Sequence, residues 1–161
     1  MNILKIPNPI LTTRCDEVTD FSQMSSFTRD MIQTAESAGL VGLAANQCSI
    51  LQRVFIVDFQ SADRSQMGEF FYDWRVFVNP KIKYNVNKGK EWEYEGCASV
   101  PNLVGLIERC KEITITAQDI QGEIFSLTLN GFLARICQHE FSHIQGILIT
   151  SPKQARELKR I

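Results

Sequence analysis

The feature that most constrains this chain is the pattern His-Glu-x-x-His, formed by its only two histidines, His139 and His143, with Glu140 after the first. On a helix, one turn separates the two imidazoles, so both point the same way and can bind one metal ion. Glu140 lies beside them and can serve as a general base. The pattern predicts a helix that carries a metal site, and it is typical of metal-dependent hydrolases.

A third ligand distinguishes the kinds of His-Glu-x-x-His site. In the longer pattern that ends in a third His, the last ligand would fall on Ile149, which cannot bind a metal, so a metzincin site is excluded. A thermolysin-type site needs a later Glu, but the one acid after His143 is Glu157, in a short basic tail. An upstream ligand is therefore required. Cys97, which follows a glycine in a polar, turn-prone stretch, is the best candidate, because a Cys-His-His set leaves one tetrahedral position open for water.

Residues 39–47, Gly-Leu-Val-Gly-Leu-Ala-Ala-Asn-Gln, are mostly small and end in an amide side chain. Small residues allow the backbone to pass close to a ligand. The side chain of Gln47 can donate hydrogen bonds to a developing oxyanion. This segment therefore adds an expected oxyanion-stabilising group to the metal site.

These three segments, in this order and at these separations, resemble the motifs of peptide deformylase. That family's motifs are usually Gly-φ-Gly-φ-Ala-Ala-x-Gln, Glu-Gly-Cys-φ-Ser and Gln-His-Glu-x-Asp-His, where φ is an apolar residue. Residues 3–11 also resemble the family's opening, and residues 77–80 its central strand. The resemblance implies an enzyme that removes the N-formyl group from the N-terminal formyl-methionine of nascent polypeptides and releases formate.

The resemblance also implies one divalent metal ion per chain, Fe(II) in the cell, which zinc or nickel can replace. It assigns the proton transfers to Glu140, and the oxyanion to Gln47 and the backbone N–H of Ala98. The remaining expected residues are the metal ligands Cys97, His139 and His143, the substrate-binding residues Val41, Gly42, Phe132 and Ile136, and the supporting residues Gln138, Arg109 and Ser142.

The chain departs from the family's pattern at Leu40, Ala98 and Ser142, where the family has Gly, a larger apolar residue and Asp. The family's Asp pairs with an Arg, here Arg109, which is expected to lose that partner or to find another acid such as Glu108. Two alternatives stay open for these reasons. One is a catalytically weak or inactive relative of the family, and the other is a metallopeptidase.

Composition and charge indicate one globular domain, residues 1–161, with 44% apolar residues and no apolar run long enough to span a membrane. The net charge is −1 with both signs mixed, which gives no sign of a membrane surface or of sequence-specific nucleic-acid binding. Five cysteines without a Cys-x-x-Cys pair are typical of free thiols in a reducing cytoplasm. We expect a cytoplasmic monomer.

Periodicity predicts an α+β fold in which antiparallel strands pack around the metal-binding helix. A first helix is expected between a cap at Ser25 or Ser26 and a stop at Gly39, and the metal-binding helix is expected to follow a cap at Asn130. The remaining expectations are strands at 53–59 and 75–79, a surface loop at 60–74, a strand and hairpin at 81–93, and a hairpin formed by 113–117 and 125–129.

The C-terminal residues 151–160 carry several basic side chains after Ser151 and Pro152. They predict at most a short turn of helix, which is either a frayed terminus or a small electrostatic patch for the ribosome. Arg135, one turn before His139, either lines the substrate pocket or pairs with an acid; we favour the pairing.

Overall fold

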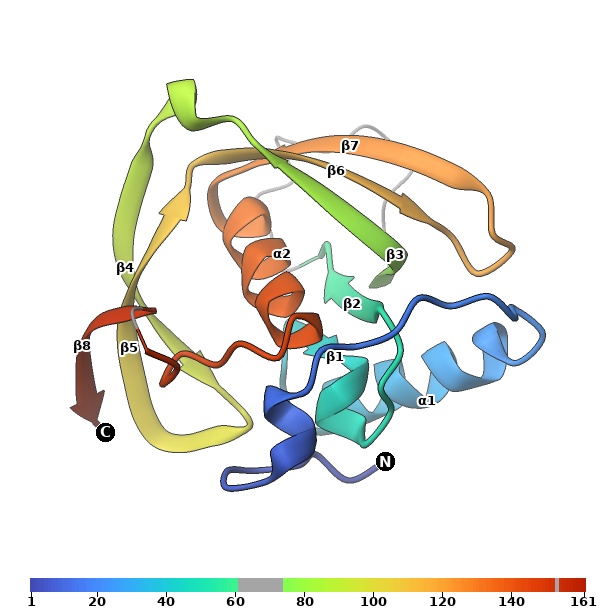
Figure 1. Ribbon diagram of the computed structural model, residues 1–161, viewed down its shortest axis with the longest axis horizontal. Helices are drawn as coiled ribbons and strands as arrows, with labels where there is room; N and C mark the ends of the chain where they lie inside the picture. Colours follow the sequence, from blue (N-terminus) through green and yellow to red (C-terminus); the bar gives the residue numbers. More distant parts are fainter. Residues whose placement is uncertain (61–73, 153) are drawn as a thin grey trace.

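The computed structural model describes residues 1–60, 74–152 and 154–161. In these residues antiparallel strands form two sheets, a five-stranded sheet in the order β1-β2-β3-β6-β7 and a three-stranded sheet in the order β4-β5-β8 (Figure 1). The predicted α+β fold is confirmed. The strands are β1 (Gly42–Ala44), β2 (Val54–Asp58), β3 (Trp74–Tyr84), β4 (Lys90–Cys97), β5 (Val100–Cys110), β6 (Glu112–Gln118), β7 (Ile124–Asn130) and β8 (Ala155–Arg160).

Helix α2 (Gly131–Ile144) lies in the space between the two sheets (Figure 1). Its apolar face packs under the five-stranded sheet, in a core that includes Leu133, Ile136 and Ile144. Asn130 occupies the predicted N-cap position, but its side chain makes no capping hydrogen bond. Because α2 is covered on both sides, its polar residues must find their partners inside the protein.

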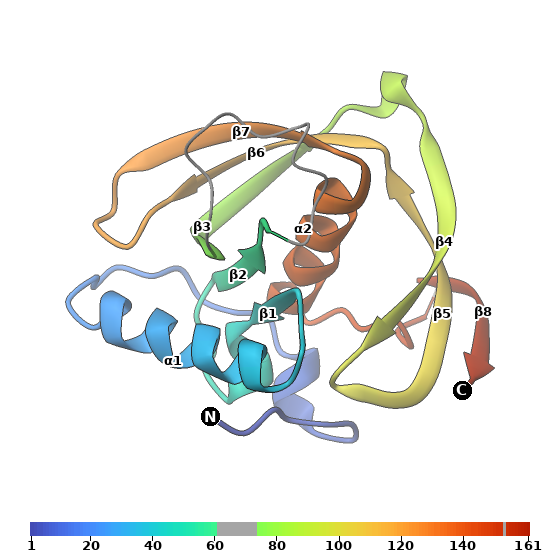
Figure 2. The same ribbon diagram turned by 180° about the vertical axis from the view of Figure 1, so that it is seen from behind.

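Helix α1 (Met24–Ser37) lies against the β1–β2 end of the five-stranded sheet (Figure 2). The predicted cap was wrong, because the helix begins at Met24 and Gln23 at the N-cap position makes no side-chain bond. The hydroxyl of Ser26 instead donates to the carbonyl of Gln23 at 3.0 Å. The predicted stop is confirmed by Gly39, whose φ of 64° is unfavourable for residues with a side chain.

Most of the predicted strands are confirmed. Residues 53–59 contain β2, and residues 75–79 lie in β3, which continues to Tyr84. The hairpin predicted within residues 81–93 was wrong, because β3 and β4, which the short 3-10 helix η4 (Val86–Lys88) connects, do not pair with each other. β3 pairs with β2 and β6, whereas β4 pairs with β5 in the other sheet. The hairpin predicted for residues 113–117 and 125–129 is confirmed, as β6 with β7. Of the predicted loop, residues 61–73 lie outside the described residues. Residues 39–47 are extended only at Gly42–Ala44, because Ala45–Cys48 form the 3-10 helix η2.

The C-terminal segment corrects the prediction of a helical turn or a frayed end. It forms strand β8, which pairs antiparallel with β5, with Leu106 opposite Glu157 and Leu103 opposite Arg160. Two contacts reach across β5 to β4, since Lys159 lies 4.4 Å from the ring centroid of Tyr94 and Arg156 lies 5.8 Å from that of Trp92. The sequence analysis missed this strand because only one of its side chains, Leu158, is strongly apolar. The segment therefore lacks the alternation of apolar and polar residues that indicates a strand.

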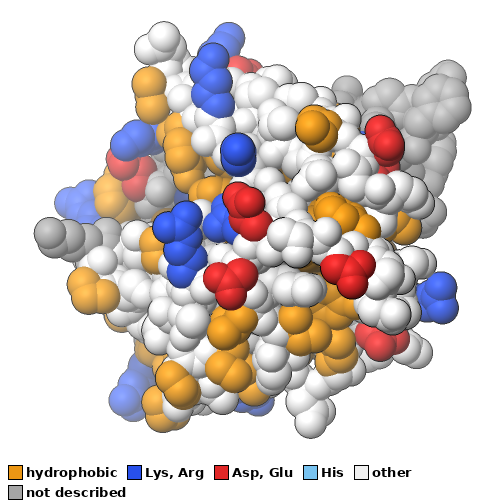
Figure 3. Space-filling model, turned by 45° about the vertical axis from the view of Figure 1, so that its right-hand side comes forward, with side chains coloured by type: hydrophobic (Ala, Val, Ile, Leu, Met, Phe, Trp, Pro, Cys, Tyr) orange, Lys and Arg blue, Asp and Glu red, His pale blue; other side chains and the backbone are white. Residues whose placement is uncertain are grey.

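On the face shown in Figure 3, basic and acidic side chains lie intermingled among apolar ones. This agrees with the balanced charge of the sequence. Among the described helices, none has the length and apolar character that crossing a membrane would require.

Candidate metal and active site

Two elements bring the three expected metal ligands together. Cys97 is the last residue of β4, and His139 and His143 lie one turn apart on α2. The potential ligand atoms of the three residues all lie within 4.8 Å of one another, and the Cys97 sulfur is 3.3 Å from Nε2 of His143. Cys97 therefore lies at a strand end, where the pairing with β5 shifts register, and not in the polar turn that its neighbours suggested.

The donor set fits a metal ion. A sulfur and an imidazole nitrogen bound to one tetrahedral ion lie about 3.5 Å apart, as follows from bond lengths of about 2.3 and 2.0 Å. The contact of 3.3 Å between Cys97 and His143 is close to that separation. His143 is 1% exposed, and Asn46 donates to its backbone carbonyl at 2.7 Å, which holds this end of the helix in place.

Glu140 lies next to the ligands and is buried, with 4% of its surface exposed. Its Oε2 atom has no hydrogen-bond partner among the described residues, and burial raises the pKa of the carboxyl to about 7. Gly42 of β1 makes room for it. A Cβ at Gly42 would lie 2.6 Å from Oε1 of Glu140 and 2.9 Å from Cγ2 of Ile136, so only glycine fits beside this carboxylate.

Gln47 belongs to η2, and its side chain also lies beside the expected metal ligands. Its Oε1 accepts a hydrogen bond from the backbone N–H of Ala44 at 2.9 Å, and its Nε2 donates to the hydroxyl of Ser99 at 3.0 Å. The same Nε2 lies 4.0 Å from the Cys97 sulfur. These bonds fix the amide so that its nitrogen faces the cysteine.

A cavity of about 260 Å³ opens beside the ligands. Its wall contains His139, Glu140, Gln47 and Ala98, together with Arg135. The four residues expected to bind substrate, Val41, Gly42, Phe132 and Ile136, all lie in this wall. The structure therefore places every expected ligand, proton-transfer and oxyanion residue except His143 along one cavity, and His143 lies 3.3 Å from the Cys97 sulfur in the cavity wall.

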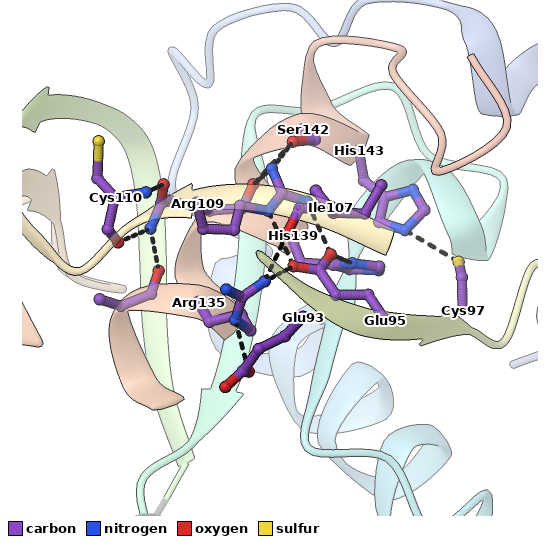
Figure 4. A network of polar contacts seen from close by, with 12 residues as sticks. Glu93, Glu95, Cys97, Ile107, Arg109, Cys110, Arg135, His139, Ser142 and His143 are labelled. Carbon is purple, nitrogen blue, oxygen red and sulfur yellow. Dashed lines mark hydrogen bonds and ion pairs between the residues drawn. The ribbon is translucent and has the colours of Figure 1, made fainter. Parts of the chain in front are cut away.

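Glu95 is the functional residue that the sequence analysis missed. It is 7% exposed and binds three groups at once (Figure 4). Its Oε2 lies 2.9 Å from Nδ1 of His139, its two oxygens accept from Arg109 at 3.0 and 2.9 Å, and Oε1 accepts from Arg135 at 2.7 Å. Burial would raise its pKa, but the bonds from His139 and Arg109 outweigh burial and lower it to about 2. A carboxylate in this position orients the imidazole toward a metal.

The surroundings of Arg109 correct a second expectation. Arg109 has another acid as its partner, as the sequence analysis allowed, but that acid is Glu95 and not Glu108, because Glu108 pairs with Lys90 at 3.1 Å on the surface. Arg109 binds Glu95 in a two-pronged pair, and its Nη1 donates to Ser142 Oγ at 3.0 Å. Ser142, which carries no charge, thus still accepts a hydrogen bond from Arg109.

Gln138 and Arg135 anchor α2 to the three-stranded sheet. The Gln138 side chain accepts from the N–H of Cys110 at 3.0 Å and donates to the Cys110 carbonyl at 2.8 Å, so it supports the helix and does not touch the ligands. Arg135 pairs with Glu95 and with Glu93, as favoured, and also lines the cavity. Both residues fix the turn of α2 that precedes His139.

Replacing Glu95 by glutamine should lower the free energy of unfolding by about 3 kcal/mol, because two buried guanidinium groups lose their shared anion. Urea unfolding followed by circular dichroism measures the loss. The matched control is Glu108→Gln, which removes an exposed pair and should cost less than about 1 kcal/mol. Equal, small losses in both variants would show that Glu95 does not hold the network together.

Comparison with known proteins agrees with this geometry. The model of the polypeptide deformylase family matches residues 1–159. Peptide deformylase 1 of Bacillus cereus is 36% identical over 152 residues, which cover 94% of this chain and 90% of that protein. Peptide deformylase 1 of Corynebacterium efficiens is 35% identical over 153 residues, covering 94% of this chain and 86% of that protein.

Among solved structures, a probable peptide deformylase from Synechococcus phage S-SSM7 superposes with a TM-score of 0.80 and 34% sequence identity, over 92% of this chain and 96% of that one. The match therefore extends through both sheets and the metal-binding helix. This chain belongs to the polypeptide deformylase family, metal-dependent enzymes that remove the formyl group from the N-terminal formyl-methionine of polypeptides.

Proposed function

We propose that Cys97, His139 and His143 hold one divalent metal ion, Fe(II) in the cell, and that the cavity beside it is where the formyl group is hydrolysed. The observation that carries this proposal is the meeting of three ligand atoms within 4.8 Å at the edge of the cavity. One thiolate with two imidazoles suits iron, zinc and nickel, so zinc or nickel can replace iron.

When bound, such an ion polarises the formyl carbonyl and lowers the pKa of the water that attacks it. Glu140 takes a proton from this water and passes it to the departing amine. Its burial beside the ligands, with one oxygen free of hydrogen bonds within the described residues, supports this role. Proton transfer of this kind contributes about two to four orders of magnitude to a rate.

Gln47 and Ala98 stabilise the oxyanion. The Gln47 amide nitrogen donates to the Ser99 hydroxyl at 3.0 Å and, in a long contact of 4.0 Å, to the Cys97 sulfur. The substrate oxyanion can replace the sulfur as the acceptor of this second N–H. Ala98, whose backbone N–H is the second donor in this proposal, follows Cys97 in the cavity wall. Each donor of this type is worth about 3 kcal/mol in the transition state.

The substrate methionine fits the apolar part of the cavity, formed by Val41, Phe132 and Ile136. Two sheet edges flank this space. Strand β1 is an outer strand of its sheet and β4 is an outer strand of the other, and both contribute residues to the cavity wall. An extended formyl-methionyl peptide can pair its backbone with such edges, which supports a peptide substrate.

Replacing Gly42 by alanine should reduce kcat/KM for a formyl-methionyl peptide by about 10- to 100-fold, because the new Cβ displaces the Glu140 carboxylate. The control is Gly96→Ala, in which the added Cβ meets only Val104, at 3.9 Å, so the melting temperature and metal content should stay at the parent's values. Unchanged turnover by Gly42→Ala would show that Glu140 tolerates displacement.

The test of the proposed function is formate release from formyl-Met-Ala-Ser by protein purified without oxygen. We expect rapid release of formate from this peptide and no cleavage of acetyl-Met-Ala-Ser or of internal peptide bonds. Cleavage of internal bonds would favour a metallopeptidase. A metal-loaded protein without formate release would be the inactive relative that Leu40, Ala98 and Ser142 made conceivable.

We also propose that residues 1–161 form one catalytic domain that works as a cytoplasmic monomer on nascent chains at the ribosome. The support for ribosome contact is the basic side chains of the exposed strand β8, Arg156, Lys159 and Arg160. Co-sedimentation with ribosomes at low salt that disappears at high salt is the expected result. Salt-independent or absent sedimentation would contradict the contact.

A further inference from the structure

A second hollow lies next to the active-site cavity. Leu40 and Ala98 line both spaces, so the two hollows adjoin at these residues. Both residues are departures from the family's usual motifs, and the small side chain of Ala98 takes up less room between the hollows than a larger apolar residue would. A peptide longer than its formyl-methionine can therefore extend from the active site past these two residues.

The hollow is lined by polar side chains, by the basic side chain of Lys5 and by several apolar residues. Gln33, Thr34 and Ser37 of α1 form one side, and residues 1–3 and Lys5 form the other. The amino terminus of Met1 donates to the hydroxyl of Thr34 at 2.9 Å. Among the described residues no Asp or Glu lines this hollow, whereas the active-site cavity carries Glu93, Glu95 and Glu140.

Lys5 is held beside the site by the backbone on each side of it. The N–H of Leu4 donates to the carbonyl of Gln47 at 2.7 Å, and the N–H of Ile6 donates to the carbonyl of Ser99 at 2.9 Å. Lys5 itself is exposed and forms no ion pair within the described part of the chain. Its ammonium group is therefore free to meet a charge on a bound peptide.

We propose that this hollow selects formyl-methionyl peptides with acidic side chains at the third and fourth positions, through the positive charge of Lys5. The inference rests on the proposed function, because the peptide must first present its formyl group to the metal site. An extended peptide advances about 3.3 Å per residue, so its third and fourth residues would lie beyond Leu40 and Ala98, on the side of the second hollow. Basic side chains at these positions would be repelled by the positive charge in the hollow. A charged groove discriminates between peptides in this way.

The experiment compares kcat/KM for three C-terminally amidated peptides, formyl-Met-Ala-Glu-Glu, formyl-Met-Ala-Ser-Ser and formyl-Met-Ala-Lys-Lys. At low ionic strength we expect the acidic peptide to exceed the basic one by about fivefold, with the neutral peptide between them. The difference in kcat/KM between the acidic and basic peptides should shrink in about 0.5 M salt, because salt screens the interaction between exposed charges. No formate from any peptide would overturn the proposed function and this inference together.

Variants of Lys5 isolate the source of the selectivity. The preference for the acidic peptide should weaken in Lys5→Gln and should disappear or reverse in Lys5→Glu, while turnover of the neutral peptide stays within about twofold. Lys81→Glu is the matched control, since it makes the same charge change at an exposed residue that lines a different hollow. Two results would overturn this inference but not the proposed function. One is turnover of the neutral peptide together with equal kcat/KM for the acidic and basic peptides. The other is an unchanged preference for the acidic peptide in Lys5→Glu.

Discussion

Replacing Glu140 by glutamine should lower kcat for formyl-Met-Ala-Ser by about two to four orders of magnitude. The glutamine amide has nearly the same shape but cannot accept the proton of the attacking water. Because Glu140 is not one of the three ligands that converge, the variant should retain its full metal content. Formate release and elemental analysis of the same preparation measure both quantities.

Glu108→Gln is the control for this variant, since Glu108 is an exposed carboxylate paired with Lys90. Its turnover should equal that of the parent within about twofold. Parent-like turnover by Glu140→Gln would remove Glu140 from the mechanism. Loss of metal together with activity would instead make Glu140 a determinant of metal binding.

Replacing Cys97 by alanine should abolish stoichiometric metal binding and reduce formate release at least about a thousandfold, because the only thiolate of the ligand set is lost. Cys48→Ala and Cys110→Ala are matched controls. Both cysteines are buried and lie outside the cluster of ligand atoms, so their variants should keep one metal ion per chain. A full metal complement in Cys97→Ala, measured by elemental analysis, would exclude Cys97 as a ligand.

Short-range patterns in the sequence predicted the parts of the site that depend on local structure. The spacing of His139 and His143 required only that their segment be helical, and the helix is there. The alternation of residues 113–117 and 125–129 required only a hairpin, which β6 and β7 form. The meeting of Cys97 with the helix is a long-range contact that no local pattern predicts. It was expected because the downstream ligands could be excluded, and the resemblance to peptide deformylase supported it.

Glu95 and the partner of Arg109 escaped prediction because they depend on how two distant elements face each other. One signal was present, since Glu91, Glu93, Glu95 and Cys97 alternate along what became β4, and alternation in a strand places such residues on one face. The predicted hairpin stopped at residue 93, and the stretch around Cys97 was treated as turn-prone, which concealed that alternation. A strand assignment would have placed Glu95 next to the metal-binding helix together with Cys97.

Strand β8 was missed for a different physical reason. Its sequence is mostly polar, and its stability comes from backbone pairing with β5 and from cation–π contacts with Trp92 and Tyr94, more than forty residues away in the chain. Neither contact leaves a local pattern. The distant pairing partner decided the structure of this segment, as is common for edge strands.

The most direct test of the central claim is an anaerobic titration of metal-free protein with Fe(II), in which formate release from formyl-Met-Ala-Ser is followed after each addition. If Cys97, His139 and His143 hold the one ion that catalysis needs, the rate should rise in proportion to added iron and stop rising at one equivalent per chain. The Cys97→Ala variant should remain inactive throughout. Full formate release before any metal is added, or by Cys97→Ala at one equivalent, would contradict the account.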